Sequence, residues 1–302
     1  MIRPGGLAAW WQAARPLAHV NIAMPLVVGQ ALAIAAGARF NAFACVLVHL
    51  FGVFDHLFIV FANDVADESG DRASATHTMF SGGSRVLPDG LLDARTLVRA
   101  ASAMALGMVL VSATAAFALG RDAMLVGCGA AIALLLAYSF APLRLSYRGF
   151  GEVVQGIGIG AVLPAIGFVA HAGSLDGFDP KWLVPIVVLG IASNMSTSLP
   201  DAPADRAVGK RTWPVRAGVA NARKHVMLVA ALGVLLTPLI LPAATDESQL
   251  AICEVPSLVV LGIAAFVWRG ADPKDRRGVT RFVALVGLAI NLALVGWTIA
   301  LL

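Results

Sequence analysis

Two acidic segments begin where long apolar runs end. In the first, NDVADESGD, Asp64, Asp67 and Asp71 stand at positions i, i+3 and i+7, so a helix would carry them on one face. In the second, LPDAPADRAVGKRT, Asp201 and Asp205 form an i, i+4 pair that also shares a face. Grouped carboxylates are hard oxygen ligands of the kind that Mg²⁺ prefers, with other positions left for water and phosphate oxygens. The pattern predicts two or more Mg²⁺ ions between the two faces, around a diphosphate.

Basic residues accompany both acidic segments, which a site for a cation alone would not require. A diphosphate that is bridged by metal on one side and held by Arg and Lys on the other uses both kinds of charge. Each base could instead serve membrane topology alone, and a single acidic cluster at a helix end is usually a solvated loop. Two ordered acidic faces on the same side favour the metal–diphosphate interpretation. The predicted diphosphate contacts are Arg72, Arg85, Arg148 and Lys210.

Polar residues inside the apolar runs have roles that the sequence leaves open. Tyr138 and Asn194 are candidates for facing a cationic reaction centre. Core packing is the alternative for Tyr138, and Asn194 belongs to a polar stripe close to the face of Asp201. Asp55 is nine residues before Asp64 and therefore points to the opposite face of the same helix. It pairs with His56 or with a polar group of a neighbouring helix, or it lines a deeper acceptor pocket.

The surrounding chain has the composition of a polytopic membrane protein. Of its 302 residues, 59% are hydrophobic and only 13% are charged, against roughly 25% charged in soluble domains. The three cysteines lie in apolar runs, too far apart for a metal site, and are interpreted as core residues. Because about 20 apolar residues cross a bilayer, we expect nine spans, at 17–37, 42–63, 96–119, 123–141, 152–172, 182–200, 223–243, 250–268 and 280–301.

The charge distribution over these nine spans predicts their orientation. All but three of the 22 Arg and Lys residues fall on the side of the N-terminus and of the loops that follow the even-numbered spans. The positive-inside rule makes that side cytoplasmic, so both acidic loops are expected there. Asp64 and Asp201 are about four helices apart, which suggests one domain, 1–302, built from two related four-helix halves, 17–141 and 152–268, plus a ninth helix, 280–301. No residue-level repeat accompanies this division.

The two acidic segments resemble the motifs of the UbiA superfamily of intramembrane prenyltransferases. The segments FSGGSRVLPDGLL and APLRLSYRGFGE are similar to stretches of its dihydroxynaphthoate polyprenyltransferase branch. The family's first motif, N-D-x-x-D-x-x-x-D, and its second, D-x-x-x-D-x-x-x-G-K-x-T, are matched by Asn63, Asp64, Asp67, Asp71, Asp201, Asp205, Gly209, Lys210 and Thr212.

The resemblance implies an all-α bundle of nine transmembrane helices around a central cavity. It also implies Mg²⁺-dependent transfer of a prenyl group from an isoprenyl diphosphate to a lipophilic, aromatic acceptor within the bilayer, by ionisation of the allylic diphosphate. No nucleic acid or obligate protein partner is expected. The positions that match the family's metal–diphosphate residues are Asn63, Asp67, Asp71, Asp201 and Asp205. Asp64 belongs to the motif as a direct or an outer metal ligand. The expected catalytic residues are Asp67, Asp71, Asp201 and Asp205.

One departure from the family pattern affects the acceptor. The naphthoate branch has an Asn-Asn-x-Arg run before its second motif, whereas this chain has TSLPD. Pro203 is tolerated only in the first turn of a helix, so Asp201 is expected at a helix N-terminus, where the dipole favours phosphate. The change leaves open a terpene cyclase of the same family, which uses no acceptor. A CDP-alcohol phosphotransferase would need a D-G-x-x-A-R type motif, which the chain lacks, and a transporter would place its site near the bilayer midplane.

Overall fold

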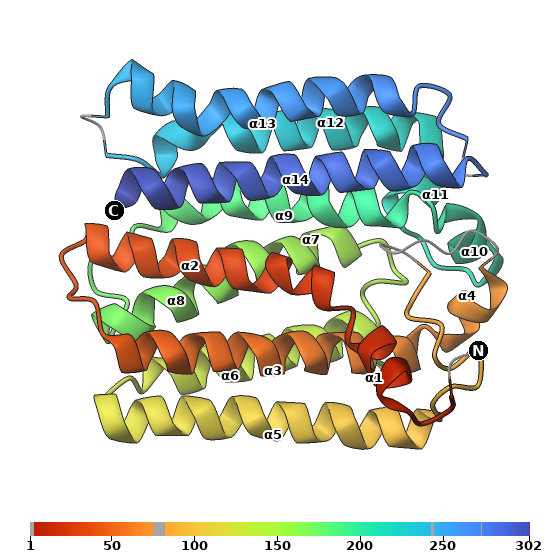
Figure 1. Cartoon of the computed structure of the whole chain (residues 1–302), viewed down its shortest axis with the longest axis horizontal. Coiled ribbons are helices and arrows are strands. Elements are labelled where there is room, and N and C mark those ends of the chain that lie inside the picture. The colour runs from red at the N-terminus through yellow and green to blue at the C-terminus, as the bar shows by residue number, and fades with distance from the viewer. Residues whose placement is uncertain (1–2, 75–81, 243–244, 273) are drawn as a thin grey trace.

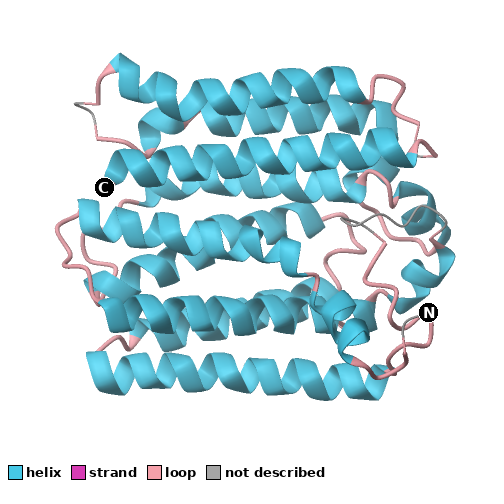
Figure 2. Ribbon diagram, in the orientation of Figure 1, coloured by secondary structure: helices cyan, strands magenta, loops and turns pink. Residues whose placement is uncertain are grey.

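The structure is a computed structural model that describes residues 3–74, 82–242, 245–272 and 274–302. These residues form helices and contain no strand (Figures 1 and 2). Phe80 and Ser81, the first two residues of the segment FSGGSRVLPDGLL, lie outside the described residues. The helices are α1 (Leu7–Ala14), α2 (Val20–Ala35), α3 (Ala42–Ala66), α4 (Glu68–Ala73), α5 (Ala94–Leu119), α6 (Ala123–Ser139), α7 (Gly151–Ile157), α8 (Leu163–Ala172), α9 (Leu183–Ser198), α10 (Ala202–Ala207), α11 (Trp213–Ala217), α12 (Val219–Leu235), α13 (Glu247–Val267) and α14 (Arg276–Leu301).

Seven helical segments within the described residues are long and apolar enough to cross a membrane. They confirm a polytopic, all-helical membrane protein, but they do not establish the expected count of nine spans. Two of the expected spans correspond to α6, with 17 residues, and α9, with 16, both shorter than the roughly 20 residues that cross a bilayer unaided. The seven segments are Leu7–Ala35, Ala42–Ala66, Ala94–Leu119, Gly151–Ala172, Val219–Leu239, Glu247–Val267 and Arg276–Leu301.

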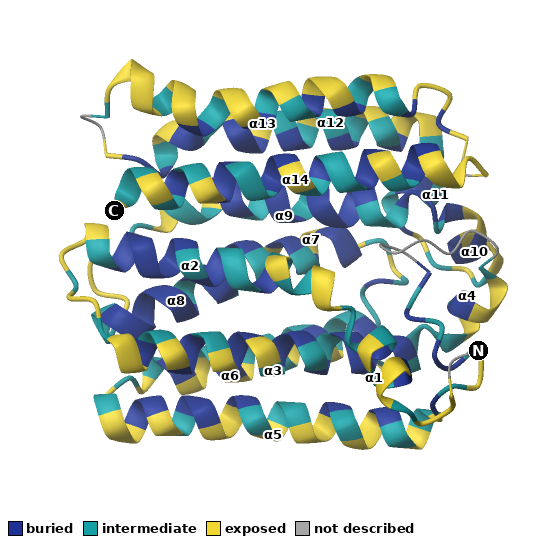
Figure 3. Cartoon of the chain, in the orientation of Figure 1, coloured by how far each residue is buried: buried dark blue, intermediate teal, exposed yellow. Residues whose placement is uncertain are grey.

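The long helices lie side by side with their axes roughly aligned, and the two chain ends fall at opposite ends of the bundle (Figure 1). Large apolar side chains point outward, among them Phe117 at 91% exposure and Phe266 at 65%, and yellow stripes mark the outer faces of α5 and α13 in Figure 3. A helix that is apolar on its outer face needs lipid rather than water around it. The exposed pattern therefore agrees with the membrane assignment.

Helices α2 and α8 approach closely at the centre of the bundle because glycine stands at both contact points. A Cβ atom on Gly29 would lie 2.1 Å from the Pro164 carbonyl oxygen, and one on Gly167 would lie 2.3 Å from the Leu26 carbonyl oxygen. Helix α8 continues α7 through a π-helical turn, Gly158–Val162. Such turns widen a helix locally and often line functional sites. This turn lines a cavity described below.

The short helices α1, α4, α10 and α11 gather at the end of the bundle where the N-terminus lies (Figure 1). Helix α4 follows α3 directly, α10 follows α9, and α4 and α10 are in contact. The two acidic segments, far apart in sequence, are thereby brought to the same end of the molecule. The division of the chain into two related halves stays a prediction.

Candidate active site

The first acidic segment straddles the junction of α3 and α4. Asp64 lies in the last turn of α3, Asp67 is the residue between the helices, with φ −101° and ψ 8°, and Asp71 lies in α4. The helical hydrogen bonds nevertheless continue across the break, from Asp67 N–H to the Asn63 carbonyl oxygen (2.8 Å) and from Asp71 N–H to the Asp67 carbonyl oxygen (2.9 Å). Because this ladder is kept, all three carboxylates reach one cavity, as a continuous helical face would predict.

The second acidic segment begins a new helix, as Pro203 predicts. Asp201 occupies the N-cap position of α10, and the proline lies in its first turn. Asp205 N–H donates to the Asp201 carbonyl oxygen at 2.8 Å, so the two side chains stand one turn apart. Both of them line the same cavity as the first segment.

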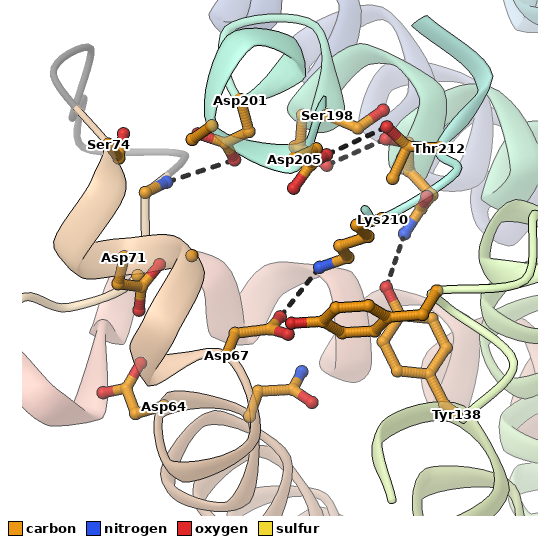
Figure 4. A pocket seen from close by; sticks show the side chains of 18 of the residues that line it. Asp64, Asp67, Asp71, Ser74, Tyr138, Ser198, Asp201, Asp205, Lys210 and Thr212 are labelled. Carbon is orange, nitrogen blue, oxygen red and sulfur yellow. Dashed lines mark hydrogen bonds and ion pairs between the residues drawn. The ribbon is translucent and has the colours of Figure 1, made fainter. Parts of the chain in front are cut away.

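The shared cavity has a volume of about 160 Å³ and is walled by acids from both segments (Figure 4). Lys210 lies between them: its Nζ donates to Asp67 Oδ2 at 2.9 Å, and its side chain is only 12% exposed. Tyr147 covers this lysine, with its ring centroid 5.3 Å from Nζ. Besides this lysine and Arg15, the cavity is lined by five aspartates, so acidic side chains outnumber basic ones.

Asp64 differs from the other acids because its oxygens are already bonded. It is 2% exposed, it forms an ion pair with Arg15, and it accepts hydrogen bonds from Ser84 N–H (3.2 Å) and from the Ser84 hydroxyl. This geometry suits a residue that holds α1 and the 82–85 loop against α3. It leaves Asp64 less free than its neighbours to take up a metal ion.

The remaining acids have unused oxygens that could take a cation. Asp201 Oδ2 accepts from Gly82 N–H at 3.2 Å, while its Oδ1 is buried with no hydrogen-bond partner among the described residues. Asp205 Oδ2 accepts from the Thr212 hydroxyl at 2.9 Å. A buried carboxylate oxygen without a donor is energetically costly, and a bound cation would offset that cost. The donor set therefore fits Mg²⁺, although no three acid, His or Cys side chains of the described chain are close enough to form a ready-made metal cluster.

Burial and mutual repulsion disturb the ionisation of these acids. Burial, with repulsion from Asp205, raises the pKa of Asp201 to about 8. Burial raises the pKa of Asp71 to about 6, against the attraction of Arg15, and that of Asp205 to about 6, against the attraction of Lys210. For Lys210, burial works against the charged form, but Asp67 outweighs it and the pKa is raised. A bound cation would relieve the repulsion and let all the acids ionise together.

Of the predicted basic contacts, Lys210 lines the cavity and the other three do not. Arg72 is ion-paired with Glu68 at 2.7 Å on the outer face of α4. Arg85 is ion-paired with Asp89 at 3.0 Å and also donates to the Asp71 carbonyl oxygen at 3.0 Å. Arg148 donates to the Pro142 carbonyl oxygen at 2.8 Å and is exposed. The diphosphate roles expected for these three residues stay predictions.

Sequence reasoning missed Arg15 at this site. This arginine ends α1 in a left-handed conformation, with φ 43°, and lines the acidic cavity from a position 49 residues before its partner Asp64. Its Nε is buried without a hydrogen-bond partner among the described residues. The available signal was a lone arginine directly before Pro16, at the start of the first apolar run.

Tyr138 and Asn194, both predicted, meet at the inner wall of the cavity. Asn194 Nδ2 donates to the Tyr138 hydroxyl oxygen at 3.4 Å and also to Gln155 Oε1. Ser139, next to the tyrosine, donates to Asn63 Oδ1 at 2.5 Å. Helices α6, α7 and α9 thus close the inner side with a connected set of neutral polar groups.

A second cavity of about 230 Å³ continues from this wall into the bundle. Arg15, Asn63, Tyr138 and Gln155 border both cavities. The second cavity is lined mainly by apolar side chains of α2, α3, α6 and α7 and by the π-helical turn. Asp55 lines this cavity, so the deeper pocket is the one of its three possible surroundings that the structure shows.

Comparison with known proteins gives consistent matches. A model of the UbiA prenyltransferase family matches residues 22–300. The 1,4-dihydroxy-2-naphthoate octaprenyltransferase of Bacillus subtilis (strain 168) is 26% identical over 210 residues, which span 69% of this chain and 65% of that protein.

Solved structures match in fold. A UbiA homolog from Archaeoglobus fulgidus bound to DMAPP and Mg²⁺ superposes with a TM-score of 0.67 at 17% identity, covering 96% of this chain and 99% of that one. The apo UbiA homolog from Aeropyrum pernix K1 gives 0.66 at 17% identity, covering 89% and 96%. At these identities the matches establish a shared fold.

Proposed function

Because the chain belongs to the UbiA prenyltransferase family, we propose that it transfers a prenyl group from an isoprenyl diphosphate to an aromatic acceptor within the membrane, with Mg²⁺ as cofactor. The observation that carries the proposal is the meeting of two acidic segments at one buried cavity, with Lys210 between them. An anionic, metal-binding substrate group explains both the acids and the lysine.

Five residues would hold two or more Mg²⁺ ions on the diphosphate. Bound Mg²⁺ supplies Lewis-acid stabilisation of the charge on the leaving diphosphate. Asp201 contributes the oxygen that has no partner, and Asp71 and Asp205 face it from the two short helices α4 and α10. The proposed ligands are Asn63, Asp67, Asp71, Asp201 and Asp205, with Asp64 behind them.

Lys210 and Arg15 are the protein's own countercharges to the diphosphate. Lys210 is held over the cavity by Asp67 and can share its three donors with a phosphate oxygen without moving far. Arg15 presents its unpartnered Nε at the boundary of the two cavities. Donors placed in advance where negative charge develops lower the barrier to breaking the allylic C–O bond.

The residues of the inner wall surround the allylic carbon in the steps that follow breakage of the C–O bond. When the C–O bond breaks, its electron pair leaves with the diphosphate, and the allylic carbon is left electron-poor beside Tyr138. The apolar lining of the deeper cavity keeps water away from that carbon. A ring carbon of the acceptor supplies the electron pair for the new C–C bond, and the ring then loses a proton.

The relative from Bacillus subtilis is named as an octaprenyltransferase for a dihydroxynaphthoate, which favours an aromatic acceptor over cyclisation of the prenyl chain on itself. We further propose nine membrane crossings, with α6 and α9 as the two short ones, and a cytoplasmic N-terminus and active-site loops. The support is that Arg and Lys concentrate on the side of the acidic loops, as the positive-inside rule requires.

Product analysis of purified protein tests the proposal. Protein in detergent with Mg²⁺ would receive geranyl, farnesyl or geranylgeranyl diphosphate, with and without hydroxylated aromatic acceptors, and mass spectrometry would identify the products. The Asp67→Asn/Asp201→Asn variant should be inactive, whereas Asp122→Asn, an exposed acid outside both cavities, should behave as the wild type. A prenylated ring that forms only with acceptor supports the transferase; a cyclic hydrocarbon or alcohol formed without acceptor contradicts it.

A further inference from the structure

Asp55 is a carboxyl group buried in the middle of α3, far from the metal-binding acids. Only 2% of its surface is exposed. No hydrogen bond or ion pair satisfies its oxygens within the described ranges of the chain. It lines the deeper cavity, so its side chain is available to a molecule bound there.

The neighbouring groups do not explain this acid. His56 Nε2 lies 2.7 Å from the Ala14 carbonyl oxygen, and its ring packs edge-on against His19 at 5.3 Å between centroids. Adjacent residues on a helix also point about 100° apart. The described residues thus show no pairing of Asp55 with His56, which was one of the three positions left open for this acid. A polar group inside a membrane protein without a partner is expensive to keep, and it marks a functional site.

The deeper cavity has the size and polarity of a pocket for one ring system. Its volume of about 230 Å³ is below the ~300–1,000 Å³ of pockets for drug-sized ligands, which suits a small ligand. Besides Asp55, it carries the polar side chains of Asn21, Gln155 and Tyr138; Asn194 already donates to the last two, but a hydrocarbon would leave the Asp55 carboxyl without a partner. A small aromatic molecule with polar substituents uses both the apolar walls and these groups.

The position of Asp55 defines where a polar substituent would lie. Asp55 is nine residues before Asp64 on the same helix, which is about 13 Å along the axis. Tyr138 borders both cavities and marks the opposite, reactive end of the deeper one. A ring bound between the two residues would direct one edge toward the diphosphate cavity and a substituent on the far edge toward Asp55.

We propose that Asp55 binds the acceptor, accepting a hydrogen bond from an aromatic hydroxyl group that is remote from the carbon to be prenylated. The inference rests on the proposed transferase function and adds to it the residue that selects and orients the acceptor. The pocket then favours a ring with a hydroxyl on its far edge over a ring without one. An isosteric acceptor lacking that hydroxyl would leave the carboxyl unpaired, which is the basis of strong discrimination.

Direct binding and steady-state kinetics of two Asp55 variants test this. Asp55→Leu removes the oxygens, and Asp55→Asn keeps one acceptor oxygen. The matched control is Glu254→Gln, which changes an acid of α13 that lines neither cavity. Binding of a naphthalenediol and of naphthalene would be measured by calorimetry in detergent with Mg²⁺ and diphosphate present. The KM values for acceptor and for prenyl diphosphate would be measured separately.

The expected result is a loss confined to the hydroxylated acceptor. In Asp55→Leu, the Kd and KM for the diol should rise about tenfold or more, as expected for a lost hydrogen bond to a carboxyl. The KM for prenyl diphosphate should stay within about twofold of the wild type, and Asp55→Asn should recover part of the loss. Naphthalene should bind at least as tightly to Asp55→Leu as to the wild type, because the leucine replaces a carboxyl that this ligand would leave unpaired.

Unchanged diol binding and KM in Asp55→Leu would overturn the inference, as would wild-type protein that binds no diol at all. Both results can occur in an enzyme that still transfers prenyl groups, so they leave the proposed function standing. Conversely, a protein that binds the diol through Asp55 but forms no prenylated product would contradict the proposed function and keep the binding site. A Mg²⁺-diphosphate thermal shift equal to that of the wild type would show that the variant is folded.

Discussion

Lys210 Nζ lies 2.9 Å from Asp67 Oδ2 and joins two segments that are 143 residues apart in the sequence. The pair is mostly shielded from water, with side-chain exposures of 12% and 25%, and it stands where the two acidic segments meet (Figure 4). A salt bridge of this kind holds α3 against the loop after α10 in the free protein. It also keeps the Lys210 ammonium group beside the acids, where it can bind an anionic substrate.

Replacing Lys210 with Met should lower kcat/KM for prenyl diphosphate by about 100-fold or more, because a charged donor is lost where negative charge develops. The matched control is Arg148→Met. That side chain also carries a positive charge on the same side of the molecule, but it is exposed and bonds only to the Pro142 carbonyl oxygen. Its activity should stay within about threefold of the wild type. Equal losses in steady-state assays of the two variants would contradict the role assigned by the geometry.

Replacing Arg15 with Met should destabilise the protein by about 3 kcal/mol, since it strands the buried carboxylate of Asp64 without a countercharge. Unfolding monitored by denaturant or heat in detergent measures the loss. Adding Asp64→Asn to the same chain should restore part of the stability, because the stranded charge is then removed. Lys181→Met removes an exposed pair with Asp179, 53% and 40% exposed, and should cost under about 1 kcal/mol. If the double variant is less stable than Arg15→Met alone, the ion pair with Asp64 is not the source of the stability that Arg15 provides.

Metal binding should depend on pH, because burial raises the pKa of Asp201 to about 8 and those of Asp71 and Asp205 to about 6. A raised carboxyl pKa means that the folded, metal-free protein holds more protons than the unfolded chain between about pH 4 and 8. Its stability should therefore fall as pH rises through this window. Mg²⁺ must displace these protons, so its affinity should increase from pH 6 to pH 8.

Calorimetric titration with Mg²⁺ at the two pH values checks this, with thermal unfolding of the metal-free protein alongside. The Asp201→Asn variant should lose most of the pH dependence between 7 and 8, because the group with the highest of these pKa values is gone. A Mg²⁺ affinity that is the same at pH 6 and pH 8 would contradict the assignment of these acids as ligands.

The positions of site residues could be predicted from the sequence where they depend on residues within about one helical turn. Pro203 correctly placed Asp201 at the start of a helix, because the constraint lies within one turn. Periodicity also brought Asp67 and Asp71 to one face, although it gave no sign that α3 ends at Ala66, directly before Asp67. The span count was less secure, because the length of α9 depends on its packing within the bundle.

The basic residues could not be assigned in this way. Whether an arginine reaches a cavity depends on tertiary contacts, and composition gave Arg72 and Arg148 the same weight as Lys210. In the structure, Arg72 pairs with Glu68 and Arg148 donates to a backbone carbonyl oxygen. Arg15, at the end of a separate helix, pairs with Asp64 at the cavity instead. Hydrogen bonds between segments far apart in sequence leave no pattern in the local sequence from which they could be predicted.

Gly83 provides a test of how tightly the first acidic segment is held. It lies in the loop that packs over α4, with φ +67°, and a Cβ atom there would lie 1.8 Å from Asp71 Oδ2. Gly83→Ala should therefore displace the Asp71 carboxylate in addition to straining the backbone. We expect Mg²⁺ affinity and kcat/KM to fall about tenfold or more, because a shift of about 1 Å at a reacting site is enough for losses of this size.

Gly90→Ala separates the two effects. Gly90 lies seven residues further along the same loop with a nearly identical φ of +65°, but nothing stands within 4 Å of an added Cβ atom. The variant should carry only the backbone strain, about 1–2 kcal/mol of stability, while Mg²⁺ affinity measured on the folded protein stays at the wild-type level. If both alanine variants lose metal affinity equally, loop strain rather than the position of Asp71 controls the site.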